Sequence, residues 1–143
     1  MATLTGCDLI QSQFNLGGDY AKSVALDFFT ETAEHLLPAH EPSEKFFRLM
    51  VAALAHLRKG GDVWATVLYF SLWSVRLTGI LPELRVRSES AEIANEMLEK
   101  PLSGLTAREW NKSTAADLRR ALIRTMEQHV ERKFLTVPLL EAL

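Results

Sequence analysis

A run of apolar residues near the middle of the chain constrains the fold more than any other feature. Residues 64–84 are WATVLYFSLWSVRLTGILPEL, and apolar side chains occupy almost every face of a helix drawn over 63–78. A helix that is apolar on nearly all sides must be surrounded by other helices. The apolar run at 63–75 ends at Arg76 and is shorter than the roughly 20 residues of a membrane-spanning helix. We therefore predict a buried central helix with no membrane partner.

The composition favours one globular domain in a reducing compartment. The chain has 143 residues, of which 48% are hydrophobic and 24% charged; these values are ordinary for a single domain with its own core. A net charge of -2 argues against a dedicated polyanion binder. Cys7 is the only cysteine, so an intramolecular disulfide is impossible. With no recognisable signal peptide, we expect a cytoplasmic protein.

Apolar spacing and helix-ending residues predict further helices on both sides of the central one. Residues 20–37 and 44–59 carry apolar side chains every three or four positions. The second of these stripes is expected to bury Phe46, Phe47, Met50, Val51, Leu54 and Leu57. Asp19, Ser43 and Asp62 are predicted N-caps, and Pro38 is expected to end the first helix. The pairs Gly60-Gly61 and Thr78-Gly79 are predicted C-terminal ends.

The second half of the chain is predicted to add shorter helices and one long one. We expect a helix at about 90–99 and, from a capping box of Thr106 with Glu109, a helical turn at 107–111. The last long helix is expected at about 114–133, begun by Ser113 or Thr114. Its predicted core stripe consists of Leu118, Leu122, Thr125 or Met126, His129 and Val130. The final segment, FLTVPLLEAL, is expected to dock against the bundle.

These patterns define one fold class. No strand pattern of any length follows residue 14, and no internal repeat is present. We predict an all-α protein, an irregular bundle of five to six helices around the apolar central helix. A short extended lead-in is expected at residues 1–18, followed by a single helical domain at 19–143.

Motifs for catalysis and metal binding are missing from the sequence. The histidines, His35, His40, His56 and His129, show no metal-ligand spacing, and there is no CxxC. No GxSxG occurs, and neither glycine pair is followed by a Lys-Ser or Lys-Thr. We therefore expect no metal, no cofactor and no enzymatic activity.

Positive charge gathers toward the C-terminal end. Residues 106–133 hold seven basic and four acidic residues, whereas residues 1–44 hold one basic and seven acidic. A solvated helix face explains this pattern most simply. Because Arg120 and Arg124 share a face at four-residue spacing, the same face could hold nucleic-acid phosphates or the carboxylates of an acidic peptide.

The aromatic side chains of the central helix have two interpretations. Trp64, Tyr69, Phe70 and Trp73 lie among other apolar residues, which favours core packing over a stacking platform for single-stranded nucleic acid. An exposed part of this surface would form a groove for the apolar end of a peptide.

Three stretches of the chain together resemble the C-terminal helical domain of the bacterial DNA repair protein family RecO. The first stretch is CDLIQSQFNLGGDYAKSVALDFFTETAEHLLPAHEPSEKFFRLMVAAL, which resembles the family's passage from an OB-fold into two helices. The second, LTGILPEL, is similar to its Leu-x-Gly-x-x-Pro-x-Leu turn, and the third, VERKFLTVPLLEAL, to its terminal motif. The resemblance covers nearly the whole chain.

The sequence also departs from that family. The zinc ribbon of RecO proteins would start near Arg87 and Ser90, which cannot supply thiolates. An Arg-Phe-Glu-Leu-like string becomes Tyr69-Phe70-Ser71-Leu72, and the Lys-Ser of the terminal motif becomes Leu135-Thr136. The OB-fold that precedes this domain in RecO proteins is expected to be missing. We therefore interpret the chain as a fragment or a reduced relative, without the zinc ribbon.

The resemblance implies a non-catalytic role in DNA repair and homologous recombination. RecO proteins anneal single strands, act with RecR and dock the acidic, apolar-ended tail of single-strand binding protein. The implied partners here are that tail, RecR and, more weakly, single-stranded DNA. Candidate contacts are Arg76, Arg85, Arg87, Arg119, Arg120, Arg124, Arg132 and Lys133. The alternatives are a stand-alone helical scaffold or dimerisation module and, third, a bundle or enzyme that binds an apolar ligand.

Overall fold

Helices make up the regular structure of the described chain. The computed structural model describes residues 20–37 and 43–143. Its elements in chain order are α2 (Tyr20–Leu36), α3 (Glu44–Arg58), α4 (Val63–Leu77), α5 (Ser88–Glu99), the 3-10 turn η2 (Leu102–Gly104), α6 (Ala116–Val130) and α7 (Val137–Glu141). No strand occurs in these ranges, so the all-α prediction is confirmed. The lead-in and the predictions for Asp19 and Pro38 lie outside the described residues.

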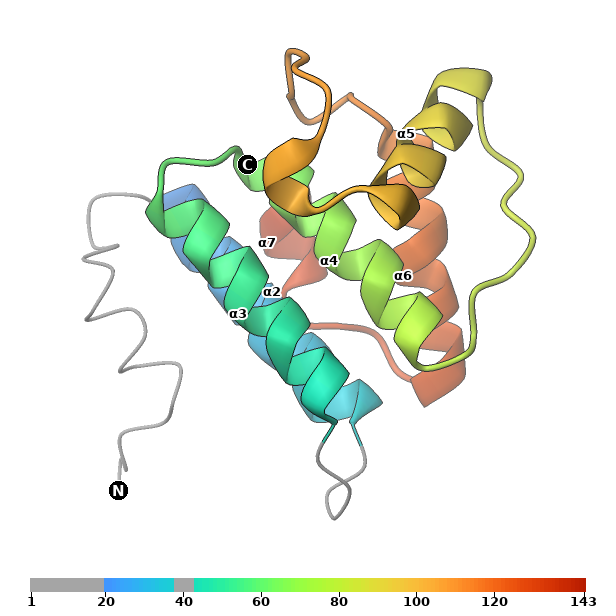
Figure 1. The fold of residues 1–143 in the computed structure, drawn as a ribbon. Coiled ribbons are helices and arrows are strands. Elements are labelled where there is room, and N and C mark those ends of the chain that lie inside the picture. Colours follow the sequence, from blue (N-terminus) through green and yellow to red (C-terminus); the bar gives the residue numbers. More distant parts are fainter. Residues whose placement is uncertain (1–19, 38–42) are drawn as a thin grey trace.

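The helix α4 is the centre of the bundle. The helices α2, α3, α5 and α6 all pack against it (Figure 1). Val67, Phe70, Leu72 and Val75 are completely buried. Buried Ser71 donates its hydroxyl to the Val67 carbonyl four residues earlier, so its polar group is satisfied inside the helix. The predicted central helix is confirmed. Within the described ranges, no helix combines the length and apolar character needed to cross a bilayer.

Phenylalanine rings from three helices and the C-terminal segment form the heart of the core. Phe29 of α2 and Phe70 of α4 are 4.4 Å apart between ring centroids, and Phe46 of α3 meets Phe70 edge-on at 5.7 Å. Phe28 contacts Phe134, which follows α6, at 6.2 Å. Aromatic pairs at these distances stabilise the core beyond the area that they bury. Segments far apart in the sequence thus meet at one cluster.

The ends of the central helices follow the predicted residues. Asp62 accepts hydrogen bonds from the backbone nitrogens of Trp64 and Ala65 at 2.8 and 3.2 Å. Gly60, after α3, has a φ of 86°, and the nitrogen of Gly61 donates to the His56 carbonyl at 2.8 Å. This left-handed ending favours a residue without a Cβ. The Asp62 cap and the Gly60-Gly61 ending could both be recognised in the sequence, because each acts on backbone groups within a few residues.

The apolar stripe predicted for α3 is partly wrong. Phe47 and Val51 are 67% and 47% exposed, whereas Leu49 and Ala53, absent from the predicted stripe, are buried. Apolar residues occur on more than one face of this helix, and only the tertiary neighbours decide which face is covered. Met50 is partly buried against the core.

Three predictions in the C-terminal half are also wrong. Neither Ser113 nor Thr114 caps the last long helix: α6 begins after Ala115, which has a φ of 54°, and no side chain caps this end. Residues 107–111 form no helix. Instead of capping such a helix, Thr106 bonds to the Glu96 carboxylate of α5, with its nitrogen 3.1 Å from Oε1. In α6 the predicted core residue His129 is exposed, and Ile123 is buried in the core instead. For Thr106, a partner ten residues earlier in the chain prevailed over the local capping pattern.

Candidate functional site: a basic-rimmed groove between α3 and α4

A groove with a volume of about 720 Å³ lies between α3 and α4, two helices that pack side by side (Figure 1). Four positions of each helix line it. These are Lys45, Arg48, Leu49 and Ala52 of α3, and Tyr69, Trp73, Arg76 and Leu77 of α4. Spacings of three and four residues place each set on one helix face. The groove therefore forms where one face of α3 meets one face of α4.

The floor of the groove is apolar and held in place. Trp73 is partly buried, and its indole nitrogen donates to the Met97 carbonyl of α5 at 3.0 Å. Tyr69 lies beside it, with 6.3 Å between the ring centroids. Burial raises the pKa of the Tyr69 phenol, so the hydroxyl stays neutral near pH 7. The floor therefore offers rigid aromatic surface that an apolar side chain can cover.

Cations form the rim of the groove. The Arg76 guanidinium lies over the Trp73 ring, with its central carbon 5.8 Å from the ring centroid. On the α3 side stand Lys45 and Arg48, both exposed, and Arg48 pairs with Glu44 at 2.7 Å. The residues that line the groove include three cations and no carboxylate. An anionic group above an apolar floor is the chemistry that this arrangement fits.

The groove continues into a smaller hollow of about 240 Å³ that shares Ala52 and Tyr69 with it. The additional lining residues are Ala55, His56, Lys59, Pro101, Leu102 and Ser103. Burial lowers the pKa of His56, although the charge of Asp62 opposes that shift. At neutral pH this hollow therefore has a largely uncharged imidazole beside the Lys59 cation.

Of the predicted contact residues, Arg76 lies in the groove. Lys45 and Arg48 were not among the predicted contacts, because the apolar stripe of α3 does not by itself show which cations flank a groove. Arg85 and Arg87 are exposed in the connection between α4 and α5, and neither lines the groove. The Arg87 nitrogen donates to the Asp117 carboxylate at 2.8 Å, which joins the start of α5 to α6.

Arg119 lies inside the protein, with 2% of its surface exposed. Its guanidinium donates to the Lys112 carbonyl at 2.7 Å, lies 4.8 Å from the Trp64 ring centroid and pairs with Glu141 at 3.4 Å. Burial lowers its pKa, and the Glu141 carboxylate opposes that change. Because the side chain cannot reach a partner at the surface, we remove Arg119 from the candidate contacts.

The remaining predicted cations lie on a different part of the surface. Arg120 is exposed and pairs with Glu141 at 3.5 Å. Arg124, Arg132 and Lys133 line a polar hollow of about 510 Å³, which also contains Glu127, Gln128 and Glu131. Lys133 lies 3.6 Å from the Glu127 carboxylate. The acidic residues reduce the positive field here, in contrast to the groove between α3 and α4.

Fold and groove together define the class of protein: an all-helical domain with an apolar groove rimmed by positive charge. Residues 17–96 match the family described as "Recombination protein O C terminal". The "DNA repair protein RecO" of Koribacter versatilis (strain Ellin345) is 33% identical over 177 residues, which cover 100% of this chain and 72% of that relative. The chain belongs to the RecO family, whose proteins act in DNA repair and recombination. No solved structure matches it significantly.

The zinc ribbon expected of this family has no place between α4 and α5. Residues 78–87 connect these helices directly, Arg87 precedes α5, and Ser90 lies in its first turn. Within the described ranges, no group of three or more His, Cys, Asp or Glu residues is placed to hold a metal ion. The alignment with that relative spans 177 positions and this chain has 143 residues, so at least 34 aligned positions have no counterpart here. The described residues between α4 and α5 include no cysteine and therefore do not supply the thiolates of a zinc ribbon.

Proposed function

We propose that this domain acts without catalysis, by docking the acidic, apolar-ended C-terminal tail of single-strand binding protein in the groove between α3 and α4. The observation that carries the proposal is the combination of an aromatic floor with a rim of three cations and no lining carboxylate. RecR remains a second proposed protein partner, on family grounds.

The chemistry of the tail matches the groove in two respects. An apolar terminal side chain would cover Tyr69 and Trp73; a hydrogen bond to α5 holds Trp73 in place, and Tyr69 packs beside it. The terminal carboxylate and the preceding acidic residues would pair with Arg76, Arg48 and Lys45. Because Arg76 already lies over Trp73, charge and apolar surface are presented together.

The test is binding of a fluorescent peptide with the acidic, apolar-ended sequence, followed by fluorescence polarisation. We expect micromolar binding that is weakened about tenfold or more by Arg76→Glu and by Arg48→Glu, because each reverses a rim charge. Ala52→Trp is expected to abolish binding by filling the groove without touching a charge. The control is Arg120→Glu combined with Arg124→Glu, which changes net charge equally or more but lies outside the groove.

The control decides where the site is. Binding that survives in the control and fails in the groove variants supports the proposal. Binding lost in the control but retained in Arg76→Glu would place the docking surface on α6 instead. A peptide that does not bind at all at high concentration would leave the scaffold or dimerisation module as the better interpretation.

Single-stranded DNA is a second candidate ligand, and the observation that favours it is the cluster of Arg124, Arg132 and Lys133 at the end of α6. Contacts to phosphates release counterions, so DNA affinity should fall steeply with salt. A weak signal that does not change with salt would argue against this role. Any assistance in strand annealing would depend on the same contacts.

A further inference from the structure

The C-terminal segment is attached to the rest of the domain by side chains. We call residues 134–143 the strap. Its two deeply buried apolar side chains are Phe134 and Leu140, each 1% exposed. The short helix α7 packs on α2. Among the described residues, the hydrogen bonds between the strap and the helices α2 and α6 all involve a side chain. A segment held in this manner can detach without disrupting a backbone ladder.

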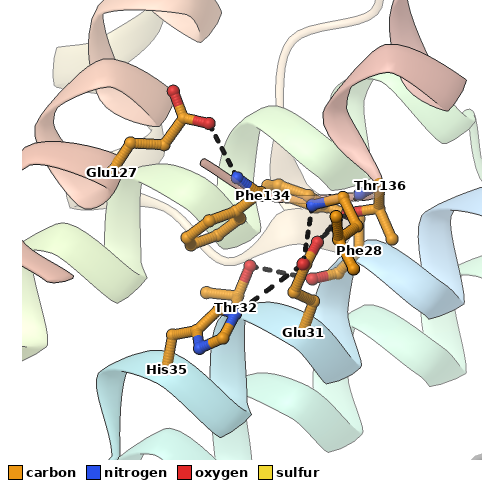
Figure 2. Close-up of polar contacts among 8 residues, drawn as sticks. Phe28, Glu31, Thr32, His35, Glu127, Phe134 and Thr136 are labelled. Carbon is orange, nitrogen blue, oxygen red and sulfur yellow. Dashed lines mark hydrogen bonds and ion pairs between the residues drawn. The ribbon is translucent and has the colours of Figure 1, made fainter. Parts of the chain in front are cut away.

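Glu31 of α2 is the main attachment at the start of the strap. Figure 2 shows its carboxylate directed at the chain that follows Phe134. It accepts hydrogen bonds from the nitrogens of Leu135 and Thr136 at 2.7 and 2.9 Å, and from the Thr136 hydroxyl at 2.6 Å. Three donors on one buried carboxylate form a strong and directional contact.

Neighbouring groups complete this attachment. The Glu127 carboxylate of α6 accepts from the Phe134 nitrogen at 2.8 Å. The Phe134 ring lies between α2 residues, 6.2 Å from the Phe28 ring and 5.3 Å from the His35 ring. The His35 imidazole is also 3.7 Å from the Glu31 carboxylate (Figure 2). The carboxylates of Glu127 and Glu31 therefore accept hydrogen bonds from the three successive backbone nitrogens of residues 134–136, beside the buried Phe134 ring.

The far end of the strap has a separate ionic attachment. The Glu141 carboxylate pairs with Arg119 and Arg120 at 3.4 and 3.5 Å, and the Lys112 ammonium donates to the Glu141 carbonyl. Between the two attachments Pro138 and Leu139 are exposed, Leu139 at 41%. The middle of the strap is thus only partly covered.

A hinge precedes the strap. Glu131 ends α6 with a φ of 56°, a left-handed conformation that a residue with a Cβ rarely adopts. The Arg132 nitrogen then donates to the Glu127 carbonyl at 3.1 Å, after which the chain turns toward α2.

We propose that the strap is a releasable element that opens as one unit while α2, α3, α4 and α6 stay folded, and that Glu31 is the catch that holds it closed. Opening frees the Phe134 and Leu140 side chains and uncovers the Phe28 ring. This device is independent of peptide docking, because no residue that lines the groove belongs to α2, α6 or the strap.

The test is hydrogen exchange of the full chain, read at the amides of 134–136 and at those of α4. In the unmodified protein the strap amides are expected to exchange faster than those of α4. Glu31→Gln should lower protection at 135 and 136 by roughly tenfold or more and leave α4 unchanged. The control, Glu34→Gln, removes an exposed carboxylate from the same helix and should change neither.

The opposite results are equally clear. If Glu31→Gln reduces protection in the strap and in α4 by the same factor, the strap is part of the global fold and the proposal is wrong. Should that variant fail to fold, Thr136→Val removes the hydroxyl donor alone and is read in the same way. A third readout is trimming by carboxypeptidase, which should be faster in either variant than in the control.

Discussion

At the scale of single residues, burial decides what a charge does. Arg76 and Arg124 are exposed and can meet a partner, whereas Arg119 is buried against Trp64 and holds the chain end in place. Glu31 is likewise buried, at 8% exposure, and serves the strap. The sequence shows only that these residues are charged. A buried charge needs fixed partners, and those partners come from elements 22 to 105 residues away.

The Glu31 carboxylate makes the stability of the domain depend on pH. Burial raises its pKa, but the hydrogen bonds from Thr136 and Leu135 and the nearby His35 outweigh that effect, so the pKa lies below its ordinary value of 4.5. A carboxyl group with a lowered folded pKa stabilises the fold above the unfolded value, and this contribution disappears as the pH falls through the folded value. We therefore expect the stabilisation to be complete above about pH 4.5.

Urea unfolding between pH 6 and pH 3 measures this dependence. The unmodified protein should lose stability steadily below about pH 4.5, and Glu31→Gln should flatten that part of the curve. The variant is expected to be less stable at pH 6, where the native carboxylate is ionised. If both proteins show the same dependence of unfolding free energy on pH, the ionisation of Glu31 does not contribute to stability.

At the scale of elements, local signals set helix ends reliably and helix faces less so. Asp62 and Gly60 act on neighbours within a few residues, and both were recognised in the sequence. Thr106 also carried a capping signal, but its nitrogen and hydroxyl bond to Glu96, ten residues earlier, and no helix follows. A capping motif has its effect only when no better acceptor lies nearby.

The cap of the central helix gives a measurable prediction. Asp62→Ala leaves the nitrogens of Trp64 and Ala65 without their acceptor and should destabilise the domain by about 1 kcal/mol. Asp62→Asn keeps a side-chain acceptor and should recover most of the loss. Thermal and urea unfolding report both values. A change of less than about 0.3 kcal/mol in the alanine variant would mean that water replaces the cap fully.

At the scale of the whole molecule, the aromatic cluster joins the helices into one core. Phe70 is the ring that Phe28, Phe29 and Phe46 all contact, and it is completely buried. The prediction of an all-α bundle around α4 depended on this helix and is confirmed. Membership in the RecO family agrees with that architecture.

Substitution of two phenylalanines, one buried and one exposed, compares the contributions of core and surface to stability. Phe70→Ala should destabilise the domain by about 3–5 kcal/mol, because it removes a buried ring and leaves a cavity. Phe47→Ala, at a residue 67% exposed, should change stability by about 0.5 kcal/mol or less. Urea unfolding of the two variants is the direct comparison. A large loss from Phe47→Ala would mean that another surface covers α3 in solution.

The sequence by itself determined the helical class, the central position of α4 and most helix ends, because periodicity and capping act over a few residues. It also showed the ingredients of a docking groove in Trp73 and Arg76. Only the tertiary structure decided which side of α3 meets α4, that Lys45 and Arg48 complete the rim, and that Arg119 is internal. The catch between Glu31 and Thr136 joins residues 105 positions apart, a contact that no local pattern encodes.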